Sequence, residues 1–139
     1  MPKADTKRRA GKAARAGKSP STQAGEYVRE EIDDVRKGKH GVRSPQQAIA
    51  IGLSKARRAG VKVPAKKGAK AKTTTPSKAR RPSPKRSRAA LNALKREPTS
   101  MVSHSALSNH ARAVAARRGP TARHVAALKA AHTRQHQAR

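Results

Sequence analysis

Residues 44–60 read SPQQAIAIGLSKARRAG, and this stretch carries both the start and the end of one helix. Ser44 is an N-cap residue, Pro45 follows at the first helical position, where its missing N–H costs nothing, and Gln47 completes a capping box. Apolar residues then recur at helical spacing until Gly60, a typical helix end. The stretch therefore predicts an amphipathic helix with one apolar face.

A second amphipathic helix is predicted upstream, where Ser19, Ser21 and Thr22 are candidate N-caps and apolar residues recur every three or four positions. Two such helices joined by a glycine-containing turn predict a helical hairpin over residues 19–64. Glycine costs about 1 kcal/mol relative to alanine inside a helix, so Gly52 predicts close approach of the two helices. The expected hairpin core consists of Val28, Ile32, Val35, Ile49, Gly52, Leu53 and Ala56.

The composition limits how much of the chain folds. The sequence has 139 residues, a formal net charge of +28, no Phe or Trp, one Tyr, and 34% hydrophobic residues, most of them Ala. Such a chain buries little apolar surface to offset the loss of conformational entropy. We expect a mostly α-helical protein in four parts: a disordered basic arm (1–18), the hairpin (19–64), a low-complexity basic linker (65–88) and a basic Ala-rich tail (89–139). Conditional helices are expected in the tail at 89–96, 103–118 and 121–137.

Positive charge is concentrated beyond the hairpin. Residues 61–88 hold eleven Lys or Arg and no acid. Each cation that meets a phosphate releases a counterion, which is a sequence-independent source of affinity. The expected partner is therefore nucleic acid, with duplex DNA favoured and structured RNA as the second choice. The expected phosphate contacts are Lys62, Lys66, Lys67, Lys70, Lys72, Lys78, Arg80, Arg81, Lys85, Arg86 and Arg88.

Five of the seven acids lie within nine residues, from Glu26 to Asp34. Like charges four residues apart on a helix repel each other, so we expect cations near them. Three interpretations are open. The favoured one is a solvated helix face. The others are a face that folds back on the basic tails and moderates their charge, and a docking face for a basic partner. A second copy of the chain is one such partner, which would make the protein a homodimer.

Several functional classes lose support. The absence of Cys removes thiolate catalysis and thiolate zinc sites. His132 and His136 lie four residues apart without a third ligand, and no acid orients His104 as a hydrolase requires. Tyr27 alone does not make a base-stacking surface, and no run of about 18 apolar residues occurs. We expect a non-enzymatic protein without cofactor or metal, not bound to a membrane and located in the cytoplasm.

The stretch KHGVRSPQQAIAIGLSKARRAGVKVP, residues 39–64, resembles the signature of a family of small, strongly basic bacterial proteins of unknown function. QAIAIGLSKARRAG, residues 47–60, is the centre of this resemblance, which covers about residues 19–64. Members continue into a tail rich in Lys, Ala and Pro, as this chain does. The resemblance implies a bacterial source and a non-enzymatic role, and it implies no catalytic residues.

The linker carries a second resemblance. Ser83-Pro84-Lys85-Arg86 is similar to the S-P-basic-basic element in the tails of linker histones, where a turn set by proline presents paired cations to a DNA groove. Similar tails in bacteria occur on proteins that compact the nucleoid, so the two resemblances together imply a location on the nucleoid, in the cytoplasm of a bacterium. This resemblance implies a turn at Ser83 that faces DNA.

The leading hypothesis is an architectural DNA-binding protein whose basic segments wrap or bridge duplexes. The second is an accessory protein of the ribosome or of another structured RNA, and the third is a module whose hairpin recruits a protein partner. Base readout by Gln46 and Gln47 is disfavoured, because both residues already serve the start of a helix and no third supporting helix is evident. The hypothesis therefore favours binding without sequence preference.

Overall fold

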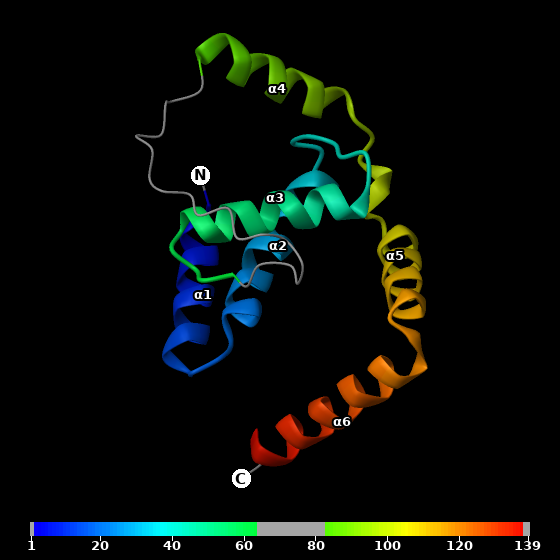
Figure 1. The fold of residues 1–139 in the computed structure, drawn as a ribbon. Coiled ribbons are helices and arrows are strands. Elements are labelled where there is room, and N and C mark those ends of the chain that lie inside the picture. The colour runs from blue at the N-terminus through cyan, green and yellow to red at the C-terminus, as the bar shows by residue number, and fades with distance from the viewer. Residues whose placement is uncertain (1, 64–82, 138–139) are drawn as a thin grey trace. The chain divides into compact units, whose positions relative to one another are not determined.

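The computed structural model describes residues 2–63 and 83–137, and Figure 1 shows its elements. Within these residues it contains six α-helices, one short 3-10 helix and no strand, which confirms the mostly α-helical fold class. The chain divides into two compact units, Met1–Ser103 and His104–Arg139. The first unit is called the folded unit below, because it holds all the buried side chains among the described residues.

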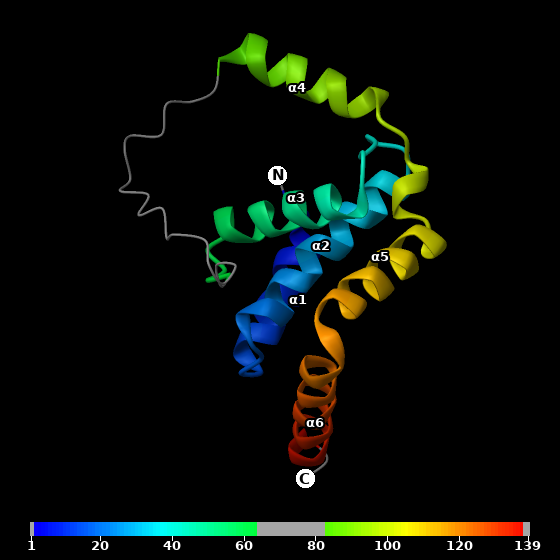
Figure 2. The same ribbon diagram turned by 45° about the vertical axis from the view of Figure 1, so that its right-hand side comes forward.

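The predicted hairpin is present as α2 (Pro20–Arg36) and α3 (Pro45–Arg58), and α3 lies across α2 (Figure 2). Each helix begins at a serine N-cap that is followed by proline. Ser19 Oγ accepts a hydrogen bond from the backbone N–H three residues on at 3.4 Å, and Ser44 Oγ accepts the equivalent bond at 3.3 Å. The serine caps are therefore used as predicted, whereas the Gln47 side chain accepts from the N–H of Arg43 and not from that of Ser44, as the predicted capping box requires.

The close approach predicted at Gly52 is confirmed. A Cβ atom at this position would lie 2.6 Å from the Cα of Val28, which is a distance that real Cβ contacts do not show. Gly52 is buried, so α2 and α3 touch through their backbones at this point. The glycine that weakens α3 as an isolated helix is therefore required by the helix pair.

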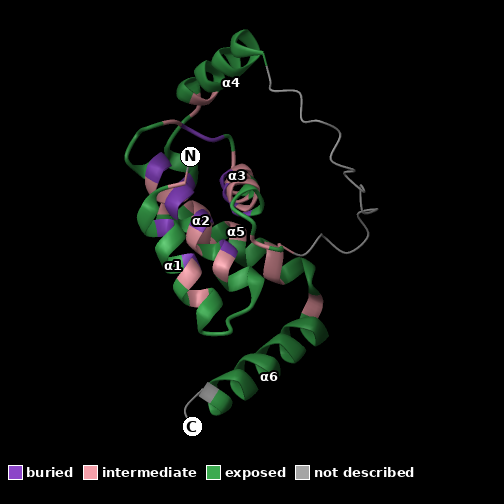
Figure 3. Cartoon of the chain, turned by 90° about the vertical axis from the view of Figure 1, so that its left-hand side faces the viewer, coloured by how far each residue is buried: buried purple, intermediate pink, exposed green. Residues whose placement is uncertain are grey.

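Two small apolar clusters form the core of the folded unit, and Figure 3 shows the buried residues on α1, α2 and α3. Of the seven expected core residues, Val35, Gly52 and Ala56 are buried, while the other four are half-buried. The first cluster comprises Ala10, Ala24, Tyr27 and Ala56. The second comprises Val35, Val42, Ala48 and Val102.

The N-terminal segment differs from the expected disordered arm. Residues Ala4–Arg15 form α1, which packs on α2 and buries Thr6 and Ala10. Sequence reasoning looked for large apolar side chains, and α1 has none. Small residues on its inner face allow close packing, and Arg9 pairs with Glu26 of α2 at 2.8 Å. The hairpin therefore has a third, supporting helix.

The folded unit also extends beyond the expected hairpin boundary at residue 64. The end of α4 (Pro84–Arg96) and the segment after it contact the turn between α2 and α3. The N–H of Gly41 donates to the carbonyl of Leu94 at 2.8 Å, and the N–H of Val42 donates to the carbonyl of Pro98 at 3.0 Å. A Cβ atom at Gly41 would overlap the backbone of Glu97. Val102, in the 3-10 helix Ser100–Val102, completes the second apolar cluster.

The S-P-basic-basic element forms a helix start rather than the implied turn. α4 spans Pro84–Arg96, five residues earlier at its start than the expected 89–96, and Ser83 Oγ accepts a hydrogen bond from the N–H of Arg86 at 3.3 Å. Proline at the first helical position after a serine cap favours a helix, as it does at the starts of α2 and α3. The expected helix at 89–96 is thus present, and it is longer.

The second unit consists of α5 (His104–Arg117) and α6 (Gly119–Gln137), close to the expected limits. Gly119 has φ of 74°, a left-handed conformation that suits glycine and separates the two helices. Val125 and Leu128 are exposed on α6. The expectation that these helices are conditional on a partner stays a prediction.

Candidate nucleic-acid interface

The acids of α2 point into the folded unit. Glu31 is fully buried, and Glu30 and Asp34 are 3% and 7% exposed. The favoured interpretation, a solvated acidic face, is therefore wrong for these three residues. The expected nearby cations are present. Lys3 comes from the predicted basic arm, whereas Lys39 and Lys55 belong to the hairpin and not to the tails that the second interpretation named.

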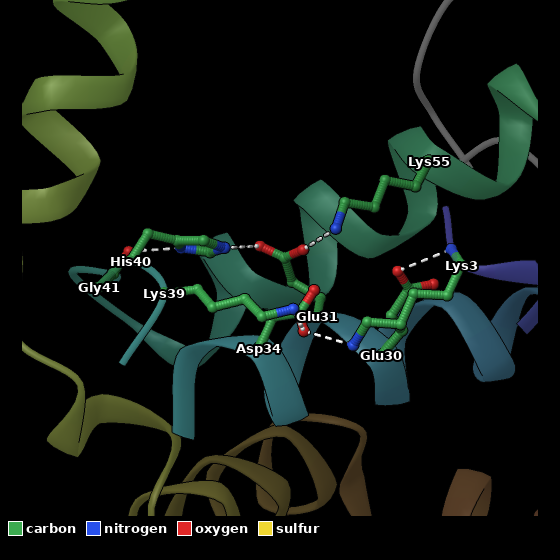
Figure 4. Close-up of polar contacts among 8 residues, drawn as sticks. All are labelled: Lys3, Glu30, Glu31, Asp34, Lys39, His40, Gly41 and Lys55. Carbon is green, nitrogen blue, oxygen red and sulfur yellow. Dashed lines mark hydrogen bonds and ion pairs between the residues drawn. The ribbon is translucent and has the colours of Figure 1, made fainter. Parts of the chain in front are cut away.

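Glu31 lies at the centre of this buried ion network, which Figure 4 shows. Its Oε2 lies 2.6 Å from Nζ of Lys55 on α3, and its Oε1 lies 3.2 Å from Nε2 of His40 in the turn. The other ring nitrogen of His40 lies 3.2 Å from the carbonyl oxygen of Gly41. The His40 ring therefore lies between a carboxylate oxygen and a carbonyl oxygen. Glu31 therefore joins α2, α3 and the turn between them.

Asp34 binds two lysines from opposite directions along the chain. Its Oδ1 lies 2.6 Å from Nζ of Lys3 and 2.8 Å from Nζ of Lys39. Burial by itself raises the pKa of Asp34, but the hydrogen bonds from Lys3 and Lys39 outweigh it and hold this pKa below its usual value. The backbone N–H of Lys3 also donates to Glu30 Oε1 at 3.1 Å. The residues before α1 are thus fastened to α2.

Other acids are likewise paired with cations of this chain. Arg9 holds Glu26, Arg8 holds Asp5 at 2.9 Å, and Arg43 holds Glu97 at 2.6 Å. Five of the seven acids are therefore in ion pairs, and Glu30 accepts a backbone hydrogen bond. Within the described part of the chain only Asp33 has neither contact. Little negative charge remains on the surface to oppose a polyanion.

The expected phosphate contacts fall into two groups. Lys62, Lys85, Arg86 and Arg88 are described and exposed, the last three on the first turns of α4. The remaining seven lie outside the described residues: Lys66, Lys67, Lys70, Lys72, Lys78, Arg80 and Arg81.

The expected phosphate contacts did not include the exposed cations of the folded unit itself. Lys7 and Lys12 on α1 and Arg57 and Arg58 on α3 are exposed, and none of them has an ion pair among the described residues. The high density of Lys and Arg before residue 19 was the available signal. It was read as a mark of disorder, because α1 lacks large apolar residues.

Lys7 and Arg58 line two shared hollows, which we call the α1–α3 cleft. One hollow, of about 400 Å³, is lined by side chains that include Gln23 and Tyr27 as well as Lys7 and Arg58. The other, of about 480 Å³, also includes Lys55. No acid lines either hollow. The cleft therefore brings together cations that are far apart in sequence.

Other kinds of site find no support in the described residues. No helix there is long and apolar enough to cross a membrane, and no group of three or more potential ligand residues is placed to hold a metal ion. His132 and His136 have their Nε2 atoms 3.0 Å apart and belong to no such group. Gln47 is occupied at the start of α3, because its Oε1 accepts the N–H of Arg43 at 2.8 Å.

A comparison with known protein families finds a match that includes α2 and α3. A family model described as a family of unknown function, DUF6496, matches residues 9–67. The match starts inside α1 and so begins earlier than the expected hairpin. No curated protein and no solved structure shows significant similarity to the chain. Over residues 9–67, the chain is therefore similar to a family whose function is not known.

Proposed function

We propose that this protein binds nucleic acid largely without sequence preference, through phosphate contacts from Lys and Arg, and that duplex DNA is its main partner. The observation that carries the proposal is that most of the acidic side chains are paired with cations of the same chain. With a net charge of +28, the chain keeps five of its seven carboxylates in ion pairs with its own cations. The cations that remain face outward with little opposing charge.

The affinity in this proposal comes from counterion release and depends on salt. Each phosphate neutralised on duplex DNA contributes a slope of about −0.9 to log affinity against log salt. Contacts to phosphates carry no sequence information by themselves. Base readout has weak support, because Gln47 is engaged at the helix start and Tyr27 is 3% exposed within the core.

Two compact units on one chain also support bridging of duplexes. Exposed cations occur in the folded unit and again on α5 and α6, for example Arg112 and Arg123. Two linked binding surfaces raise the effective concentration of the second contact. Compaction of DNA by this chain therefore needs no self-association.

Binding is tested with fluorescently labelled duplexes of unrelated sequence and equal length over a series of salt concentrations. We expect affinities that agree within a few fold, because a true base contact is worth about 1–3 kcal/mol. A hundredfold preference for one sequence would contradict phosphate-driven binding. Sedimentation of a cell lysate then decides the partner: we expect DNase to release the protein, whereas release by RNase alone points to structured RNA.

A further inference from the structure

The α1–α3 cleft has the size and lining of a ligand site. Its two hollows of about 400 and 480 Å³ fall within the range of about 300–1,000 Å³ that is usual for such sites. Gly11 and Ala14 form part of the wall on α1, where small side chains leave room for a ligand to approach. The position of α1 on α2 creates this space, so the cleft belongs to the tertiary structure.

The charges in the cleft are unopposed. Lys7 and Arg58 line both hollows, are exposed, and have no ion pair among the described residues. Lys55 lines one hollow, but its charge is matched by Glu31. On the opposite side of α1, a hollow of about 450 Å³ contains Glu26 among its cations, and Glu26 is paired with Arg9. Unlike that hollow, the cleft offers cations alone.

A phosphate group fits this chemistry. The planar guanidinium of Arg58 can donate two parallel hydrogen bonds to phosphate oxygens, and the ammonium of Lys7 acts as a mobile point charge. Because the two cations stand on different helices, they approach a bound group from different directions. A single phosphate bound between them supplies the negative charge that the cleft lacks.

We propose that Lys7 and Arg58 clamp a phosphodiester of the bound nucleic acid in the α1–α3 cleft. This inference rests on the proposed function and deepens it, because it assigns phosphate contacts to the folded unit in addition to the basic linker. Free phosphate has the same chemistry and is the alternative source of the bound group.

Tyr27 supplies a reporter inside the cleft. It lines the hollow of about 400 Å³ and is the one tyrosine in the chain. Protein labelled with 3-fluorotyrosine therefore gives a single fluorine resonance from this site. We expect that resonance to shift and saturate when the full-length protein is titrated with a short duplex, and to move little with inorganic phosphate at millimolar concentration.

The variants are a matched pair of double substitutions. Lys7→Ala with Arg58→Ala removes the clamp. Lys12→Ala with Arg57→Ala removes the same charge from the same two helices, at exposed positions that do not line the cleft. Circular dichroism verifies that both variants keep the wild-type helix content.

We expect the clamp variant to abolish the duplex-induced fluorine shift and to flatten the salt slope by about 0.9, the value for the one phosphate that the clamp holds. The control variant should keep the shift and lose less of the slope. Equal effects of the two variants would overturn the clamp while leaving phosphate-driven binding intact. A fluorine shift with inorganic phosphate and none with duplex would also overturn it, in favour of a free-anion site. Wild-type protein that binds no duplex would instead refute the proposed function.

Discussion

Replacing Lys55 with Met removes the cation that faces Glu31 inside the folded unit. The distance from Nζ to Oε2 is 2.6 Å, and the Glu31 side chain is 0% exposed. Breaking a buried pair by removing one partner costs about 3–5 kcal/mol, because the remaining charge is left without compensation. Two features place the expected cost of this substitution near the lower end of that range. The Lys55 side chain is 21% exposed, and His40 still lies 3.2 Å from the other carboxylate oxygen.

We therefore expect Lys55→Met to lower the free energy of unfolding by about 3 kcal/mol, out of the 5–15 kcal/mol that is usual for a domain. Urea unfolding followed by the fluorescence of Tyr27 measures this, because the one tyrosine lies in the core of the folded unit. With a urea dependence of about 2 kcal/mol per molar, the midpoint should fall by about 1.5 M.

The control is Lys62→Met, the same substitution at an exposed lysine without an ion pair among the described residues. It should change stability by less than about 0.5 kcal/mol. Combining Lys55→Met with Glu31→Leu should restore much of the loss, because an apolar pair leaves no unpaired charge. A loss below about 1 kcal/mol for Lys55→Met would refute the reasoning, since that is the value of an exposed ion pair.

Three further predictions concern packing and pH in the folded unit. Gly52→Ala should lower the urea midpoint because its Cβ meets backbone at 2.6 Å, whereas Gly25→Ala, which meets nothing within 4 Å, should raise stability by up to about 1 kcal/mol. Val102→Ala should cost about 2 kcal/mol in the same assay, and Val125→Ala on an exposed site should cost almost nothing. The pKa of Asp34 is lowered in the folded protein. Its carboxylate therefore stabilises the fold fully above the unfolded pKa of about 3.9, and this contribution is lost as pH falls below that value. In Asp34→Asn the urea midpoint should therefore fall less steeply as the pH is lowered.

Each of these expectations has a contrary result. Equal tolerance of alanine at residues 52 and 25 would mean that the two helices are further apart than the structure places them. Equal cost at residues 102 and 125 would mean that the segment after α4 does not dock on the hairpin. If the urea midpoint of Asp34→Asn fell with pH as steeply as that of the wild type, the lysines would not hold the Asp34 carboxylate.

Local signals made the hairpin predictable. The serine caps followed by proline and the apolar residues at helical spacing depend only on neighbours within one helix. Gly52 marks the crossing because a small residue is needed there. The same local rule explains the start of α4 at Pro84, where the resemblance to linker-histone tails had implied a turn.

Non-local contacts were not predictable in this way. α1 has no apolar stripe of large residues, and its place on α2 depends on small side chains and on Arg9 with Glu26. The α1–α3 cleft depends on that placement, so Lys7 and Arg58 could not be paired from sequence. Val102 joins Val35 across a long stretch of chain for which no periodicity gives a register.

The sequence by itself determined the helical hairpin and the excess of positive charge, because capping, spacing and net charge are properties of short segments or of composition. Only the tertiary structure decided which way the acids face. Periodicity assigns burial to apolar residues, yet Glu31 is buried because Lys55 from the next helix reaches it, and Asp34 because Lys3, 31 residues away, does. A buried carboxylate is stable only when a cation arrives from elsewhere in the fold, and no local pattern around the acid records that arrival.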